Sequence, residues 1–472
     1  MKRAASRSKP LPLPARDRTA GRAPAGWRTY LVLTVALAPI CLPLGLGNSA
    51  FLDFLNVIAL VVYSYVLLTP GRRLLTPLLA PVALIAVGSL LATIGAVSPT
   101  NAMLSVAQDA YLFVWFVALV NLIRGEREVR LACKVWMGTA VFISLVALAQ
   151  VAVYEGSLSA ILGARGLRPE ATLYNPNMLA DYLVTSLFLS LSLFGDVRKR
   201  FLLPAIGTLL LGLLASKSNG GILSFFAGAA VWLVVRALAA RVHLGTIVAG
   251  VLLVAGFAGL GLWVHQEWGV GEAQLASIRQ NTFAGRMEKS SRVRMRIWDQ
   301  LERAYRRNPL GIGPGNSSSL TVSITERERP DSYQSKEAHS DYLSYAIERG
   351  PLGLAGLLLM TGVLFAQVFA TWRDRPRSGA RERCNGRWVA AAAGALTASA
   401  AHSAVIEKLH FRHFWLLLAL VSASAVIAAR HAARRRARVE RSQAEVERAA
   451  LPALRPARRR LRPAGYFQRV TV

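Results

Sequence analysis

Twelve apolar segments, each about long enough to cross a membrane, are the feature that most constrains how this chain folds. An α-helix rises about 1.5 Å per residue, so about 20 apolar residues cross a hydrocarbon core of about 30 Å. Only 17% of the residues are charged, whereas about 25% is usual in soluble proteins. We therefore predict an all-α polytopic membrane protein with about 12 transmembrane helices. The segments are residues 29–47, 50–69, 74–97, 104–123, 131–153, 176–195, 199–216, 219–240, 244–264, 339–371, 387–406 and 413–430.

Positive charge is distributed unevenly among the loops that join these segments. The net charge is +30, and about two thirds of the 56 Lys and Arg residues fall in the terminal tails and in alternate loops. Cytoplasmic loops of membrane proteins carry such an excess of Lys and Arg. We therefore predict that both termini are cytoplasmic and that the long hydrophilic loop 265–338 lies outside. The short outside loops hold Arg165, Arg168, Lys217, Lys408 and Arg412.

This topology divides the chain into five regions. Arg-rich tails can bind nucleic acid, but beside membrane spans they are more typical of topology anchors that contact anionic lipid. We therefore expect membrane lipids rather than nucleic acid as partners, and we expect the last helix to continue into the cytoplasm. The regions are a basic tail (1–28), nine transmembrane helices (29–264), the large periplasmic loop (265–338), three transmembrane helices (339–431) and a second basic tail (432–472).

Three aspartates fall a few residues inside spans that begin outside. They are Asp53, Asp109 and Asp181, and the predicted topology places all three at the outer end of the membrane. A charged side chain within a span usually faces a partner or a wet cavity. The pattern therefore indicates either a polar cavity that opens outward or side chains that simply reach the headgroup region.

His339 begins the run HSDYLSYAIERGPLG, where the large loop meets an apolar segment. On a helix it would share one face with Tyr342, Gly350 and Gly353, and the two glycines would let another helix approach closely. A neutral imidazole accepts a proton near pH 7, which makes His339 a candidate general base. The alternative is an interfacial histidine with a structural hydrogen bond. A lone histidine favours that alternative, whereas the arginines nearby in the sequence favour catalysis.

Residues 290–307 are predicted to form a surface helix within the large loop. Arg294, Trp298, Leu301 and Tyr305 would lie on one face of it. Because a guanidinium forms bidentate hydrogen bonds to phosphate oxygens, Arg294 is a candidate for binding a pyrophosphate. The alternative is a basic amphipathic helix that lies on lipid headgroups.

Further cations lie in the other outside loops. Arg165 and Arg168 precede the turn Asn175-Pro176-Asn177, and Lys217 lies at the outer mouth between two spans. These cations depart from the positive-inside tendency. They are therefore candidates for binding an anion, with chance placement as the alternative.

The sequence shows no motif for a cofactor. The glycine-rich run 311–316 follows no strand and lies outside, where nucleotides are scarce, so we predict a tight turn. Glu407, His410 and His413 do not share one helical face, which favours interfacial histidines over a metal site. With neither a P-loop nor an Asp-x-Asp pair in the sequence, we predict no metal and no ATP. An outward-facing site would then draw its energy from an activated lipid-linked donor.

Several of these motifs resemble those of the O-antigen ligases. His339-Ser340 followed after nine residues by Gly350-x-x-Gly353 is similar to the histidine signature of that family. Arg294-x-x-x-Trp298 with the following run NPLGIGPG is similar to the start of the family's large periplasmic loop. The turn 175–180 and the run 216–221 are similar too, although relatives usually have arginine at the position of Lys217. The likeness covers most of the chain, and O-antigen polymerases share the architecture.

The resemblance implies an integral-membrane glycosyltransferase of the GT-C type in the inner membrane of a Gram-negative bacterium. Such an enzyme moves a polysaccharide from undecaprenyl pyrophosphate to the lipid A core oligosaccharide at the periplasmic face. It inverts the anomeric configuration and needs no cofactor. On this hypothesis His339 is the general base. The pyrophosphate contacts are Arg294, Arg165, Arg168 and Lys217, and the candidates for acceptor contact or structural support are Tyr342, Ser340, Asn177 and Trp298.

Two other functions stay open. A polysaccharide polymerase would use the same donor and a second lipid-linked glycan as acceptor. A transporter or flippase would instead call for charges at the membrane midplane and for internal repeats. Both features are weak or absent in the sequence, so transport ranks third.

Overall fold

A computed structural model describes residues 25–41, 51–69, 73–155, 167–240, 245, 283–317, 338–374 and 379–450. Every regular element within these ranges is a helix, as the apolar segments predict. The helices are α1 (Trp27–Leu37), α2 (Phe51–Leu67), α3 (Leu79–Ile94), α4 (Pro99–Leu122), α5 (Glu126–Glu155), α6 (Pro176–Ser192), α7 (Lys199–Ala215), α8 (Asn219–Ala240), α11 (Phe283–Arg307), α12 (Asp341–Arg373), α13 (Gly379–His402) and α14 (Arg412–Ala450).

Each described helix other than α11 overlaps a predicted span, whereas the span 244–264 lies outside the described residues except for residue 245. Five are both long and apolar enough to cross a membrane: α4, α5, α8, α12 and α14. Three apolar helices are shorter, namely α1, α2 and α3. The structure thus confirms an all-helical protein with membrane-spanning helices, while the total of twelve spans stays a prediction.

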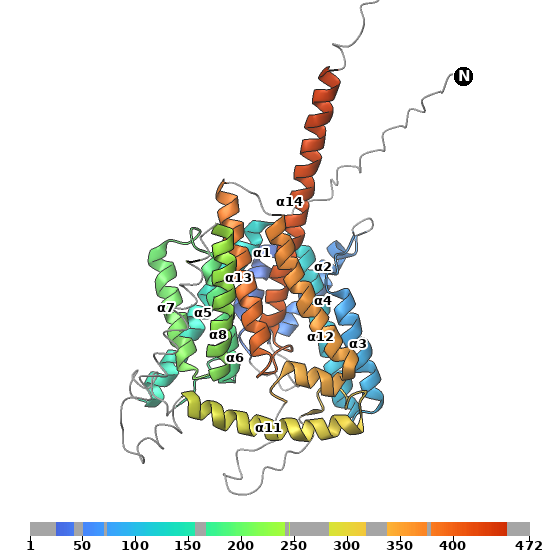
Figure 1. Ribbon diagram of the computed structural model, residues 1–472, viewed down its shortest axis with the longest axis vertical. Coiled ribbons are helices and arrows are strands. Elements are labelled where there is room, and N and C mark those ends of the chain that lie inside the picture. Colours follow the sequence, from blue (N-terminus) through green and yellow to red (C-terminus); the bar gives the residue numbers. More distant parts are fainter. Residues whose placement is uncertain are drawn as a thin grey trace, which may run out of the picture.

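The long helices run side by side in a bundle, and two elements leave it (Figure 1). Helix α11 lies across one end of the bundle, and α14 continues beyond the opposite end. Within the bundle α13 packs against α8 and α6, while α12 packs against α3 and α14. Large side chains such as Trp115, Trp136 and Phe188 are fully buried between the helices, so the bundle has a continuous packed core.

Helix α12 is broken near its start, which sets the orientation of the segment that follows His339. Gly350 has φ 67° and ψ −168°, a conformation open almost only to glycine. Pro351 follows it, and proline lacks the N–H that a continuing helix needs. A short helix (341–349) therefore precedes the long one, and Figure 1 shows it turned across the end of the bundle beside α11.

The last helix extends well past the bundle, as the sequence predicts. Helix α14 has 39 residues, and its described side chains from Ala433 to Val446 are exposed. This segment is rich in arginine and glutamate, and within the described residues Arg435 ties it to the end of α12 by donating to the Asp374 carbonyl.

Candidate active site

His339 lies just outside the helix that the sequence placed it in. Helix α12 begins at Asp341, and Ser340 is its N-cap, with Oγ accepting a hydrogen bond from the Leu343 nitrogen. His339 itself has φ 52° and is half-buried. The prediction that His339, Tyr342, Gly350 and Gly353 share one helical face is therefore wrong. Serine is a favoured N-cap because its oxygen accepts from an orphan backbone N–H, and the helix therefore begins two residues after His339.

The left-handed backbone of His339 is maintained by contacts on both sides. Before it, the carbonyl of Ala338 accepts a hydrogen bond from Trp298 Nε1 at 2.8 Å. After it, the Asp341 nitrogen donates to the carbonyls of Ser403 at 2.8 Å and Ile406 at 3.2 Å. A non-glycine residue adopts this conformation only where its surroundings impose it. The imidazole is therefore presented from a rigid turn rather than from a free loop.

Tyr342 and Trp298 support this turn. The Tyr342 hydroxyl donates to the Ala400 carbonyl at 2.9 Å, which ties the first turn of α12 to the end of α13. Trp298 packs beside a small separate core formed by Ile297, Leu301 and Ala338 with Ile312 and Ile347. Whether Tyr342 and Trp298 contact the acceptor or give structural support stays a prediction.

Helix α11 has the amphipathic character that the sequence predicts, although it begins earlier, at Phe283. Leu301 is buried, while Arg303 and Arg306 point to solvent and pair with Asp299 and Glu302 one turn away. Arg294 is half-buried, and burial lowers the pKa of its guanidinium. Arginine nonetheless stays charged at any ordinary pH. Arg294 thus brings a partly desolvated positive charge to the side of α11 that faces the bundle.

The glycine-rich run braces the short helix, in keeping with the predicted tight turn. The nitrogens of Ile312 and Gly313 donate to the carbonyls of Ile347 and Glu348, at 2.9 and 3.0 Å. The Glu348 carboxylate in turn accepts from the nitrogens of Gly315 and Ser317, both at 2.9 Å. These bonds hold the short helix (341–349) at its C-terminal end, which is the end farther from His339.

Two of the predicted anion-binding cations, Arg168 and Lys217, lie beside the start of α6. Arg168 Nη2 donates to Asn177 Oδ1 at 2.9 Å, and Arg168 Nε donates to the Ser216 carbonyl at 3.2 Å. Ser218 Oγ donates to the same Asn177 oxygen at 2.9 Å. Lys217 stands between these two serines, is 5% exposed and has φ 51°. The structure therefore brings Arg168, Asn177 and Lys217 into one cluster, while Arg165 lies outside the described residues.

The three aspartates inside spans all have partners of opposite charge. Asp53 pairs with Arg412, whose Nε lies 3.0 Å from Oδ1. Asp109 pairs with Arg349, which also donates to Ser89 Oγ at 2.8 Å. Neither a wet cavity nor simple headgroup contact is therefore needed to explain Asp53 and Asp109. Ion pairing satisfies carboxylates at this depth.

Asp181 has the most elaborate surroundings of the three. Oδ1 lies 2.9 Å from His402 Nδ1 and 2.7 Å from Lys408 Nζ, and Oδ2 lies 3.1 Å from His413 Nε2. Sequence reasoning missed His402 and the pairing of Lys408. A signal was present, since an acid inside a span calls for a cation at the same depth, and Lys408 was an unexplained cation on that side.

His410 and Glu407 do not join this group as metal ligands. His410 packs its ring against Phe411, with centroids 4.4 Å apart. Among the described residues, no group of three or more His, Cys, Asp or Glu side chains is arranged to hold a metal ion. The cluster around Asp181 contains the ammonium group of Lys408, which cannot act as a metal ligand.

One known protein family matches a segment of the chain that includes His339. Residues 204–358 match the protein-family model Wzy_C, described as O-antigen ligase. Over this segment the chain is similar to the O-antigen ligases. The match covers about a third of the chain, and it includes Lys217, Arg294, His339 and both glycines of the histidine motif. No curated protein matches the sequence significantly.

This match confirms the family likeness drawn from the motifs. The Wzy_C family covers ligases and polymerases of O-antigen, which are membrane glycosyltransferase-like enzymes. It implies lipid-linked glycan substrates and a membrane environment. Arg168, Asn177 and Asp181 lie outside the matched segment, so only the tertiary structure connects them with it.

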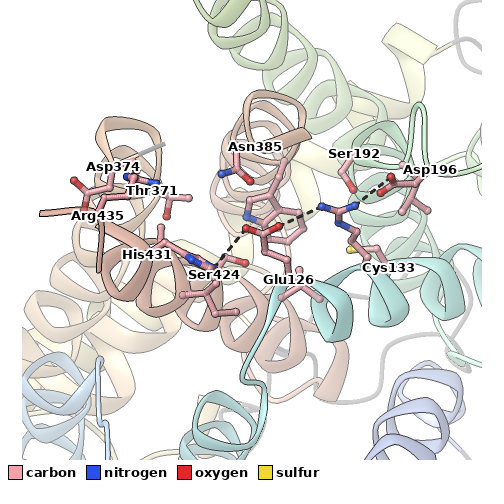
Figure 2. Close-up of a pocket in the computed structure, with 16 residues that line it drawn as sticks. Glu126, Cys133, Ser192, Asp196, Thr371, Asp374, Asn385, Ser424, His431 and Arg435 are labelled. Carbon is pink, nitrogen blue, oxygen red and sulfur yellow. Dashed lines mark hydrogen bonds and ion pairs between the residues drawn. The ribbon is translucent and has the colours of Figure 1, made fainter. Parts of the chain in front are cut away.

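A pocket lies at the opposite end of the bundle and is not part of this site. It is lined by the start of α5, the end of α6, the end of α12, the first half of α13 and the middle of α14. In Figure 2 Glu126 lies between His431 and Asp196. Arg130 bridges the two carboxylates at 3.3 and 3.4 Å.

Proposed function

We propose that this protein is an O-antigen ligase that transfers a polysaccharide from undecaprenyl pyrophosphate to the lipid A core oligosaccharide. The observation that supports this best is His339, which lies within the matched segment and is presented from a turn that Trp298 and Ser403 hold in place. The site would face the periplasm, with the enzyme in the inner membrane of a Gram-negative bacterium and both termini cytoplasmic.

The domain organisation follows from this topology. Residues 29–264 and 339–431 would form the membrane part, of the GT-C type, and residues 265–338 the large periplasmic loop. The basic tails 1–28 and 432–472 would lie in the cytoplasm. Helix α11, across the end of the bundle that carries His339, is consistent with a loop that covers the site (Figure 1).

In the proposed reaction His339 is the general base. Its neutral imidazole takes the proton from a hydroxyl group of the core oligosaccharide, and the freed oxygen attacks the anomeric carbon of the donor sugar. A new carbon–oxygen bond forms as the bond from that carbon to the pyrophosphate oxygen breaks. The leaving group keeps the electron pair, and one displacement inverts the anomeric configuration. No metal or ATP enters this scheme.

The departing pyrophosphate needs its charge stabilised. Arg294 on α11 and the cluster of Arg168 and Lys217 are the groups we assign to it, together with Arg165. Positive groups fixed in advance stabilise developing charge better than mobile ones, because they need not reorganise during the reaction. Lys217 and Arg168 are fixed through Asn177 and the α7–α8 turn, which favours this role.

The test is transfer by the purified protein in nanodiscs, supplied with lipid-linked glycan and rough lipopolysaccharide without ATP. We expect a ladder of larger products, and we expect His339→Ala to reduce its rate by about 10²- to 10⁴-fold. His431→Ala, a histidine at the opposite end, is the matched control and should act like the parent. Normal ligation by folded His339→Ala would refute the assignment of the base.

A polymerase is the second candidate, because the matched family covers it and it would use the same donor. The acceptor separates the two functions. If products grow only when lipid-linked glycan is the sole acceptor, and rough lipopolysaccharide stays unmodified, polymerisation is the function. Transport ranks third. Movement of the donor across a vesicle membrane by the His339→Ala variant would support it.

A further inference from the structure

The carboxylate of Asp181 lies at a junction between the two halves of the candidate site. It stands on α6, one helical turn after Asn177, and its side chain is 4% exposed. Three donors from three other places in the fold reach it. They are His402 at the end of α13, Lys408 in the α13–α14 turn and His413 in the first turn of α14.

This cluster is expensive to bury. Removing a carboxylate and an ammonium from water costs several kcal/mol for each ion, and pairing often does no more than recover that cost. Lys408 is 0% exposed, and its Nζ also lies 2.7 Å from Ser399 Oγ. A buried network of this kind contributes little net stability, but it admits only one arrangement of the segments that supply its members.

On one side the cluster determines the position of the segment that carries His339. Lys408 binds Asp181 through its side chain, and its backbone nitrogen donates to Asp341 Oδ1 at 2.9 Å. The Asp341 nitrogen donates back to the carbonyls of Ser403 and Ile406 in the same turn. Asp341 follows His339 by two residues, so the position of the turn determines the position of the imidazole.

On the other side the cluster determines the positions of the cations Arg168 and Lys217. Asn177 accepts hydrogen bonds from Arg168 and from Ser218, the residue that follows Lys217. His402 packs against the start of α8, where a Cβ added to Gly220 would lie 3.2 Å from the imidazole and 2.8 Å from Val405. The α7–α8 turn that carries Lys217 therefore rests on the histidine that Asp181 orients.

We propose that Asp181 is a positioning residue that fixes the general base relative to the cations that receive the leaving group. This inference rests on the proposed function of the same site. Asp181 is buried and does not touch the substrate; it acts through Lys408 and His402. Because a displacement of about 1 Å between reacting groups can lower a rate about 10²-fold, loss of this junction should impair catalysis more than binding.

The experiment compares Asp181→Asn and Asp181→Glu with the parent in nanodiscs, using lipid-linked glycan and rough lipopolysaccharide. For Asp181→Asn we expect kcat per folded molecule to fall about 10²-fold, while KM for the donor changes less than about threefold. Asp181→Glu keeps the charge, so it should recover part of the loss. The acid limb of the pH–kcat profile should stay in place, because His339 remains the group that titrates.

Three outcomes would overturn the proposal. They are an unchanged kcat per folded molecule in Asp181→Asn, no recovery by Asp181→Glu, and a displaced acid limb, which would give Asp181 a part in proton transfer. Asp196→Asn, an acid at the opposite end, is the control and should keep its activity within about twofold.

Two further measurements keep the test decisive. If Asp181→Asn does not fold, His402→Gln retains a neutral hydrogen-bond donor beside Asp181 and should lower kcat by up to about tenfold; an unchanged kcat contradicts positioning. His339→Ala is measured in parallel. Normal transfer by His339→Ala overturns the proposed base, whereas an inactive His339→Ala with a fully active Asp181→Asn overturns the positioning role alone.

Discussion

Charged side chains cluster at both ends of the helical bundle, but the two clusters differ in burial. At the end that carries His339, the side chains of Lys408 and Asp181 are 0% and 4% exposed. At the opposite end, Arg130 is 37% exposed and its partners Glu126 and Asp196 are 26% and 18% exposed. Figure 2 shows Glu126 and Asp196 among the residues that line the pocket.

The difference in burial changes what an ion pair does. Exposed pairs contribute about 0–1 kcal/mol, since water and salt screen them and the side chains lose freedom. A buried pair gives little net stability, yet removing one partner leaves an unpaired charge and is severely destabilising. The cluster of Asp181 and Lys408, called the outer cluster below, therefore specifies geometry around the candidate site. The cluster of Arg130, Glu126 and Asp196, called the inner cluster, tolerates change. The following predictions test this contrast, in order of decreasing effect.

Lys408→Met should cause the largest loss of stability. It removes the ammonium from Asp181 and leaves the carboxylate buried with two imidazoles. Breaking a buried pair in this way lowers the free energy of unfolding by about 3–5 kcal/mol. Denaturation in mixed micelles measures it, and a loss below about 1 kcal/mol would show that the outer cluster is no more demanding than the inner one.

Gly350→Ala should come next. Its φ of 67° is strained for alanine, and the added Cβ would lie 2.6 Å from the Leu310 carbonyl oxygen. The backbone strain alone costs about 1–3 kcal/mol, and the short helix that follows His339 would shift. The unfolding free energy and transfer activity should both fall. Gly362→Ala, on the same helix with open space around it, is the control and should not destabilise.

Trp298→Phe should have a smaller effect that is confined to the outer end. It keeps the aromatic ring and removes the N–H that bonds the Ala338 carbonyl. A single hydrogen bond of this kind contributes about 1 kcal/mol. We expect transfer activity to fall several-fold with little loss of folded protein. Unchanged activity would mean that the turn around His339 does not depend on α11.

Arg130→Gln should have the smallest effect. It removes both partly exposed ion pairs of the inner cluster, so the free energy of unfolding should fall by no more than about 1 kcal/mol. Transfer activity should stay at the parental level. A loss as large as that of Lys408→Met would remove the distinction between the two ends.

Much of the architecture could be predicted from the apolar segments. Lengths of about 20 apolar residues define helices, because every backbone polar group within a membrane must be satisfied inside the segment. The continuation of α14 past the bundle and the amphipathic face of α11 follow from local charge and periodicity. The break at Gly350 was missed, because an apolar segment with a glycine and a proline can also form a kinked continuous helix.

The candidate site divides in the same way. The sequence by itself determined that the chain forms membrane-spanning helices, that His339 stands where a hydrophilic loop meets one of them, and that its motif resembles the O-antigen ligases. These properties reside in local runs of residues. Only the tertiary structure decided that Asp181, Lys408 and His402 meet, and that this group joins the turn after His339 to the cations near Asn177. The sequence signals that Asp181 needs a cation, but local patterns do not say which of the residues more than 200 positions away supplies it, so the pairing depends on how the helices pack.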